Sequence, residues 1–285
     1  MKELALPPRV RPGDAVALVS PSWFGAGAFP HRVGRGRAYL ESLGLRLKVM
    51  PNALAMGDWT AGTPGQRADD LHAAFADSEV AVVLCAIGGN HSNELLDLLD
   101  YDLIRARPKV FQGLSDITVL HCALHRHAGL ATFQSTCTRA WRWMGVAASR
   151  RDGKPHLRWL PRIALLACQG VAEWLDLEGC VLLLEPSEEA PSPAEVSSYL
   201  TDLRRLGALD QISGLVFSRP INYRVEDIPI LWKVVRDATD GLGIPVLANF
   251  DCGHSDPMLT VPLGAVVRLD STAGSLATTG AATVA

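Results

Sequence analysis

Several features that would point to other classes of protein are missing from this sequence. The 285 residues carry 27 Lys and Arg against 30 Asp and Glu, so the net charge is -3, and no run of basic residues occurs. Nucleic-acid-binding proteins usually carry a basic patch, so we expect no nucleic-acid partner and a small polar molecule instead. No G-x-G-x-x-G motif opens a helix, which argues against a dinucleotide-binding protein.

The N-terminus also lacks the features of a targeting segment. The stretch MKELALPPRVRPGD has no apolar core of a signal peptide and contains two consecutive prolines. No uninterrupted apolar run approaches the roughly 20 residues that a membrane-spanning helix needs. We therefore expect a cytoplasmic protein with no membrane partner.

The six cysteines form no C-x-x-C pair, and four of them have Val, Leu, Ala or Ile as neighbours. Such surroundings are typical of buried free thiols in a reducing compartment. The spacing predicts neither a disulfide framework nor a zinc site, so we expect no metal and no cofactor. The cysteines are Cys85, Cys122, Cys137, Cys168, Cys180 and Cys252.

The first half of the chain alternates between strand and helix patterns, which predicts an α/β fold with a parallel sheet. The expected strands are residues 14–20, 45–50, 80–87 and 108–112. The expected helices are residues 33–43, 66–76 and 93–100, the last capped by Ser92. Ligands of such sheets bind beyond the carboxyl ends of the strands. Those ends are residues 20–22, 88–90 and 113–115.

The second half has a core of its own, so we divide the chain into domains at 1–137 and 179–285, joined by a connection at 138–178. A buried strand at 180–184 ends at Glu185, and Ser192 to Glu195 forms a capping box with proline at the first helical position. The further expected strands are 212–218, 246–250, 259–269 and one in the C-terminal tail, and the expected helices are 194–206 and 228–238.

Ser115 follows an expected strand and has two possible roles. A serine before Asp116 is a normal helix N-cap, and the aspartate complements the helix dipole. Alternatively, Ser115 is a nucleophile on a tight turn, where backbone N–H groups can stabilise an oxyanion. Gly113 leaves room for such a turn, but Ile117 replaces the second glycine of G-x-S-x-G. The motif alone leaves both roles open.

A serine nucleophile needs a base and an orienting acid. Among eight histidines, His254 stands out because it lies in a polar loop directly after an expected strand. His121 and His125 are four residues apart and could form a metal pair, but no carboxylate at helical spacing completes it, so we interpret them as helix-face residues. Glu185 ends a buried strand, so the rigid backbone places its carboxylate, although a surface charge is the simpler interpretation.

The alternatives Glu188 and Glu189 fall in the turn after Glu185, where we expect them to be more solvated.

Three separated blocks around these candidates resemble the LD-carboxypeptidase family of serine peptidases, in the same order. They are most similar to the branch that contains the microcin C immunity proteins. The resemblance covers most of residues 5–137 and 179–270. The blocks are IGGNHSNELL, LDYDLI and PKVFQGLSDIT (residues 87–118), EPSEEAPSP (185–193) and NFDCGHSDPM (249–258).

The resemblance implies a triad of Ser115 as nucleophile, His254 as general base and Glu185 as the acid that orients the histidine. It implies an oxyanion hole formed by the backbone N–H groups of Gly89 and Asp116. The implied architecture is a Rossmann-like N-terminal domain and a smaller α/β C-terminal domain, with the site in the cleft between them, usually in a homodimer.

Two segments depart from the family pattern, and both border the implied substrate cleft. The connection at 138–178 is shorter than in the family and lacks a Gly-Gly-Asn block. The family's Phe-Tyr/His-Gly-Pro segment is here Phe-Gln-Ser-Thr at 133–136. The triad survives these changes, but they leave the substrate preference open.

The resemblance therefore leaves three functions open. The first is hydrolysis of an amide bond near a free carboxylate in a peptidyl- or aminoacyl-adenylate mimic, for self-immunity. The second is release of the L,D-linked residue of a murein tetrapeptide in cell-wall recycling, and the third is a non-catalytic relative. The expected substrate contacts are Asn90, Ser92, Trp141 and Trp143. Either tryptophan could stack on adenine, although packing in a core or interface would equally explain it.

Overall fold

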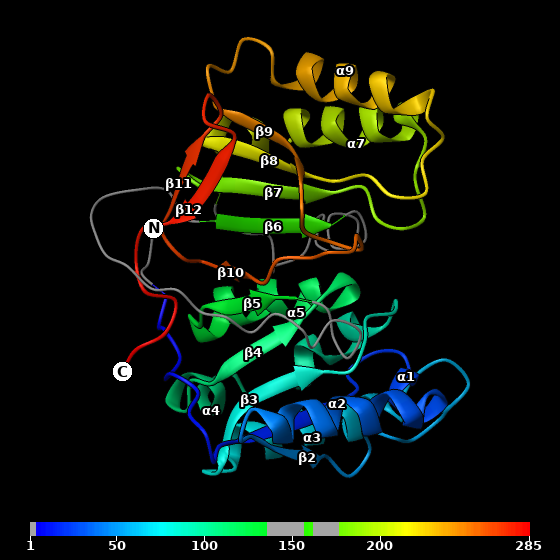
Figure 1. Cartoon of the computed structure of the whole chain (residues 1–285), viewed down its shortest axis with the longest axis vertical. Helices are drawn as coiled ribbons and strands as arrows, with labels where there is room; N and C mark the ends of the chain where they lie inside the picture. The colour runs from blue at the N-terminus through cyan, green and yellow to red at the C-terminus, as the bar shows by residue number, and fades with distance from the viewer. Residues whose placement is uncertain (1–3, 136–156, 162–176) are drawn as a thin grey trace.

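The computed structural model describes residues 4–135, 157–161 and 177–285 (Figure 1). The expected α/β class is confirmed. Trp141 and Trp143, together with most of the connection at 138–178, lie outside the described residues, as do Cys137 and Cys168. Within the described part of the chain, no helix is long and apolar enough to cross a membrane.

The N-terminal half forms most of a six-stranded sheet with the order β10-β5-β4-β3-β1-β2. Strands β1 to β5 pair in parallel, and β10 pairs antiparallel with β5. Strand β1 is buried along its whole length and β3 at every position except Ala81, which explains why continuous apolar runs predicted them. The strands are β1 (Ala15–Val19), β2 (Arg46–Val49), β3 (Val80–Cys85), β4 (Val110–Gly113), β5 (Thr132–Gln134) and β10 (Val261–Leu263).

Helices cover both faces of this sheet, and each face has its own apolar cluster. The α-helices are α1 (Gly25–Ala28), α2 (Pro30–Ser42), α3 (Pro64–Ala76), α4 (Tyr101–Ala106) and α5 (Thr118–Ala123). Two 3-10 segments, η1 (Ser92–Leu98) and η2 (Ser115–Ile117), and one π-helical turn, η3 (Leu124–Ala128), complete this half.

The single helix expected at 93–100 is wrong, because the chain instead forms η1 and then α4. The Asp100 side chain accepts a hydrogen bond from the Leu103 N–H and so starts a new helix at that point. Ser92 does not cap η1 either, since His91 occupies the N-cap position and Ser92 lies inside the segment.

The C-terminal half forms a four-stranded parallel sheet with the order β6-β7-β8-β9, and α7 and α9 lie together over one face (Figure 1). The predicted capping box at Ser192 and Glu195 is confirmed, with both reciprocal hydrogen bonds present. The elements are β6 (Leu157–Pro161), β7 (Val181–Glu185), α7 (Pro193–Arg205), α8 (Ala208–Gln211), β8 (Gly214–Ser218), α9 (Asp227–Thr239), β9 (Val246–Phe250), β11 (Val267–Asp270) and β12 (Ser275–Thr278).

The end of the chain joins the two halves. The strand expected at 259–269 is in fact two strands, and the first of them, β10, leaves the C-terminal sheet to pair with β5 between the two sheets (Figure 1). One apolar cluster contains Phe111 and Leu120 from the first half and Leu183 and Val216 from the second. The two sheets therefore share a core, which fixes the carboxyl end of β4 relative to that of β7.

Candidate active site

Ser115 lies at a sharp turn directly after β4. Its φ is +63°, in the left-handed region that residues other than glycine rarely adopt. The N-cap position of η2 belongs to Leu114, and no side chain caps this turn. The interpretation of Ser115 as a helix cap is therefore wrong. A left-handed residue costs about 1–2 kcal/mol, so the surrounding structure must hold Ser115 in place.

Two glycines make room for this turn. A Cβ on Gly88 would lie 2.7 Å from the Ser115 Cβ, and a Cβ on Gly113 would lie 2.4 Å from the Ile117 Cγ2. Ile117 stands where the G-x-S-x-G pattern has its second glycine, and the bare backbone of Gly113 accommodates it. The loop after β3 thus packs directly against Ser115.

Asp116 ties the loops at this sheet edge together through its buried carboxylate. Its Oδ2 accepts hydrogen bonds from the Ser22 Oγ at 2.6 Å, the His91 N–H at 2.9 Å and the Ser92 N–H at 2.8 Å. The Ser92 Oγ in turn donates to the Asp116 carbonyl oxygen at 2.7 Å. Because these bonds join three strand ends, they hold the turn after β4 against its neighbours.

Gly89 lies in the same cluster. Its φ is +152°, and a Cβ there would lie 2.3 Å from the Ser22 Oγ, so a larger residue could not keep this backbone position. The two residues expected to form an oxyanion hole, Gly89 and Asp116, therefore lie on neighbouring loops that contact each other around Ser115 and Ser22.

Glu185 and His254 form a close pair at the carboxyl edge of the second sheet. The Glu185 Oε1 lies 2.6 Å from the His254 Nδ1 and also accepts the His254 backbone N–H at 2.5 Å. The Glu185 side chain is only 3% exposed. Gly253 permits this approach, because its φ is +86° and a Cβ there would lie 2.2 Å from the Glu185 carboxyl carbon. The residues expected as acid and base are thus brought together.

The second ring nitrogen of His254 has a partner that the sequence analysis missed. Its Nε2 lies 2.9 Å from the Glu188 Oε2, and the Glu188 side chain is 51% exposed. Burial opposes a positive charge on the ring, but the hydrogen bonds to Glu185 and Glu188 outweigh it and raise the pKa of His254 to about 10. The bond to His254 also lowers the pKa of the Glu188 carboxyl. Among the described residues, no hydrogen bond joins His254 to Ser115.

His121 and His125 are buried side chains of the N-terminal half. The His121 Nε2 lies 3.3 Å from the Gly113 carbonyl oxygen, and the His125 Nε2 lies 2.9 Å from the Thr132 Oγ1. Burial lowers the pKa of His121 to about 4, so its ring is neutral at pH 7. No group of three potential metal ligands occurs in the described part of the chain. The partners of both rings belong to the N-terminal half, and His121 contacts the strand end before Ser115.

Models of one family match both halves of the chain. The N-terminal domain of LD-carboxypeptidase matches residues 16–135, and the C-terminal domain matches residues 163–269. The chain belongs to the LD-carboxypeptidase family. It is accordingly a serine carboxypeptidase-like enzyme, and the candidates for each part of such a site lie at the carboxyl ends of strands in its two sheets.

Several relatives support this membership. SCO6489 of Streptomyces coelicolor is 32% identical over 97% of this chain and 96% of its own length, and its name describes it as a carboxypeptidase. The microcin C7 self-immunity protein MccF of Escherichia coli is 24% identical over 90% of this chain and 91% of its own length. The murein tetrapeptide carboxypeptidase of Pseudomonas aeruginosa is 43% identical over only 24% of this chain and 23% of its own length.

Solved structures of MccF have the same fold. The complex of MccF with aspartyl sulfamoyl adenosine matches with a TM-score of 0.83 and 22% identity, over 98% of this chain and all of that one. An MccF-like protein from Streptococcus pneumoniae, solved with AMP, matches with a TM-score of 0.78 and 24% identity, over 92% of this chain and 98% of that one.

An exposed tryptophan that stacks on the loop after β3 was not anticipated from the sequence. Trp59 is 59% exposed, and its ring stacks on His91 with ring centroids 6.2 Å apart and planes 26° apart. His91 is one of the residues held by the Asp116 carboxylate. Tryptophan is enriched at interfaces, because it combines a large apolar ring with a polar N–H group. The flanking sequence Gly-Asp-Trp-Thr-Ala-Gly indicates a turn, which was the available sign that Trp59 would be exposed.

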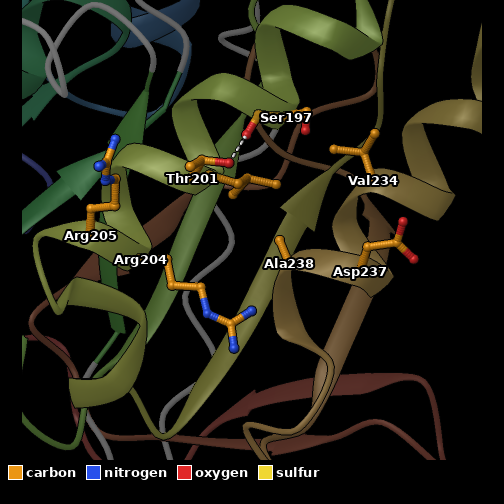
Figure 2. A pocket seen from close by; sticks show the side chains of 8 residues that line it. Ser197, Thr201, Arg204, Arg205, Val234, Asp237 and Ala238 are labelled. Carbon is orange, nitrogen blue, oxygen red and sulfur yellow. Dashed lines mark hydrogen bonds between the residues drawn. The ribbon is translucent and has the colours of Figure 1, made fainter.

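A groove between α7 and α9 is a separate feature (Figure 2). Its volume is about 230 Å³, and its lining includes Thr201 and Arg205 from α7 and Val234 and Ala238 from α9. These residues belong to the C-terminal halves of the two helices. In a parallel α/β layer those ends lie toward the amino ends of the strands, away from Glu185. This groove is therefore no part of the candidate active site.

Proposed function

We propose that this LD-carboxypeptidase family member cleaves an amide bond near a free carboxylate with a Ser-His-Glu triad. The observation that carries the proposal is the buried Glu185 carboxylate, which accepts two hydrogen bonds from His254. A carboxylate on Nδ1 fixes the tautomer in which Nε2 is the nitrogen that can act as a base. Ser115 supplies the nucleophile on a strained turn, where its hydroxyl is only partly buried.

The proposed reaction follows from these roles. The Ser115 Oγ attacks the substrate carbonyl carbon while its proton passes to the His254 Nε2. His254 then gives that proton to the leaving amine, and water hydrolyses the resulting ester by the reverse exchange. The backbone N–H groups of Gly89 and Asp116 are the proposed donors to the oxyanion. No metal or cofactor is needed for any of these steps.

For the substrate, we propose an aminoacyl- or peptidyl-adenylate-like molecule, as in self-immunity to such antibiotics. The stacked Trp59 and His91 favour this choice, because they offer a flat aromatic surface to a base beside the Ser115 turn. Asn90 is exposed next to His91 and remains a proposed substrate contact. Ser92 is fully buried, and we propose that it supports Asp116 instead. A murein tetrapeptide is the alternative, because relatives carry names of both kinds.

The test is hydrolysis of aspartyl sulfamoyl-adenosine and of a murein tetrapeptide, followed by mass spectrometry. We expect Ser115→Ala to lower turnover of the true substrate by about 10⁴-fold or more, since it removes the nucleophile. Ser197→Ala, an exposed serine on α7, is the control and should leave turnover unchanged. The triad proposal fails if a folded wild-type protein cleaves neither compound and Ser115 does not react with a fluorophosphonate reagent. That result would support the non-catalytic alternative.

We also propose a cytoplasmic location and a homodimer. The described cysteines Cys85, Cys122, Cys180 and Cys252 are all buried free thiols, which suits a reducing compartment. The dimer rests on the family resemblance, and light scattering after gel filtration would measure it directly. A mass of about 30.6 kDa, that of one chain, would contradict the dimer.

A further inference from the structure

Both ring nitrogens of His254 are engaged by carboxylates. Nδ1 lies 2.6 Å from Glu185 and Nε2 lies 2.9 Å from Glu188. A ring that donates from both nitrogens is an imidazolium and has no lone pair to offer. In this arrangement His254 cannot take the proton of Ser115, so the proposed reaction requires one of the two contacts to break first.

The two carboxylates are held very differently. The Glu185 side chain is 3% exposed and makes two hydrogen bonds to His254, and the bare backbone of Gly253 packs against it. The Glu188 side chain is 51% exposed. A half-exposed ion pair contributes little to stability, because water screens it and both side chains lose entropy. Glu188 is therefore the partner that can leave.

The backbone near Glu188 is fixed, so the side chain can move while the turn stays in place. The Glu188 carbonyl oxygen accepts a hydrogen bond from the Asn222 Nδ2 at 2.8 Å. Ser187 and Ala190, on either side, have φ of +61° and +49°, so the turn is tightly specified. Rotation about the side-chain bonds of Glu188 would carry its carboxylate into solvent.

We propose that Glu188 is a reversible latch on the base His254, which is closed in the free enzyme and displaced when substrate binds. The proposal rests on the role of His254 proposed above. When the latch opens, the Nε2 proton leaves to solvent, and the neutral ring then offers its lone pair to the Ser115 hydroxyl. Glu185 keeps its place on Nδ1 throughout, which preserves the required tautomer.

The other charged groups near His254 do not replace Glu188 in this role. Asp251 pairs with Arg219 at 3.0 Å, so its charge is balanced locally. The Cys252 thiol is buried, which together with the negative charge of Glu185 raises its pKa well above the ordinary value and keeps it neutral. Glu185 and Glu188 are the two groups that favour the charged form of the ring.

The latch predicts that Glu188→Gln makes His254 a better base. The neutral amide no longer stabilises the imidazolium, so the pKa of His254 should fall toward neutral pH. Below that pKa, the neutral fraction of the ring rises tenfold for each pH unit by which the pKa falls. Glu189→Gln is the matched control, since it removes the neighbouring exposed carboxylate from the same turn.

Two measurements test the latch on the full chain. NMR titration of the ring nitrogens, with His254→Ala used for assignment, should show a pKa at least one unit lower in Glu188→Gln than in wild type and Glu189→Gln. Labelling of Ser115 by a fluorophosphonate at pH 7 should be at least tenfold faster in Glu188→Gln than in Glu189→Gln.

Either of two results would overturn the latch: an unchanged pKa in Glu188→Gln, or a lowered pKa with no gain in labelling rate. If Ser115 resists the reagent in every variant, the proposed function fails, whereas the titration still decides whether Glu188 controls the charge of His254. The two failures are thus distinguishable.

Discussion

At the scale of single residues, the candidate site depends on places where a side chain is missing. Gly253 lets the Glu185 carboxylate contact the His254 backbone, and Gly88 lets Ser115 approach the loop after β3. In both places a methyl group would clash with the side chain of a proposed triad residue. The geometry of the acid, the base and the nucleophile is therefore set by their neighbours as much as by their own rotamers.

Gly253→Ala should abolish activity, because its Cβ would lie 2.2 Å from the Glu185 carboxyl carbon and would separate the acid from His254. The matched control is Gly241→Ala, at φ +77° with no atom within 4 Å of the new Cβ. Both variants carry the cost of a left-handed alanine, about 1–2 kcal/mol. The backbone strain should lower the free energy of unfolding by a similar amount in both variants. Labelling of Ser115 should be lost in Gly253→Ala alone. Equal labelling rates would contradict this account.

Only some of the residues of the candidate site could be predicted from the sequence. Strand-end positions and the family resemblance were enough to nominate Ser115, Glu185 and His254. The contact between Glu188 and Nε2 was missed, because it depends on the rotamer of a side chain that the pattern indicates to be solvated. The supporting role of Ser92 was missed for a similar reason, since its partner Asp116 is distant in sequence.

At the scale of elements, the predictions followed local physics. Buried strands such as β1 and β3 were found from their apolar runs, and α7 from its capping box. The helix expected at 93–100 failed, because the cap at Asp100 interrupts it and favours a short 3-10 segment before α4. The pairing of β10 with β5 was not predictable, because local periodicity does not specify a strand's partner.

The capping box of α7 allows a test of stability apart from activity. The Ser192 Oγ accepts the Glu195 N–H, and the Glu195 carboxylate accepts the Ser192 N–H. Ser192→Ala should lower the free energy of unfolding by about 1 kcal/mol in urea, since a helix N–H loses its partner. Ser197→Ala, in the exposed part of the same helix, should change it by less than about 0.5 kcal/mol. Equal losses in the two variants would show that the cap contributes nothing specific.

At the scale of the whole molecule, the proposed triad is divided between two sheets, with Ser115 on the first and Glu185 and His254 on the second. Its geometry therefore depends on the sheets behaving as one body. Two features join them, the antiparallel pairing of β10 with β5 and the apolar cluster that Leu183 and Val216 share with Leu120. A core common to both halves predicts that they unfold together.

Leu183→Ala tests this shared core. Leu183 is completely buried in β7, so its truncation should lower the free energy of unfolding by about 2–5 kcal/mol. Because the cluster spans both sheets, hydrogen exchange followed by mass spectrometry should show amides of β3 and of β8 losing protection at the same, lowered urea concentration. Leu206→Ala, a leucine 54% exposed, should shift neither. Loss of protection in β8 alone would mean that the sheets unfold separately, and the triad would then depend on a weaker interface between two independent domains.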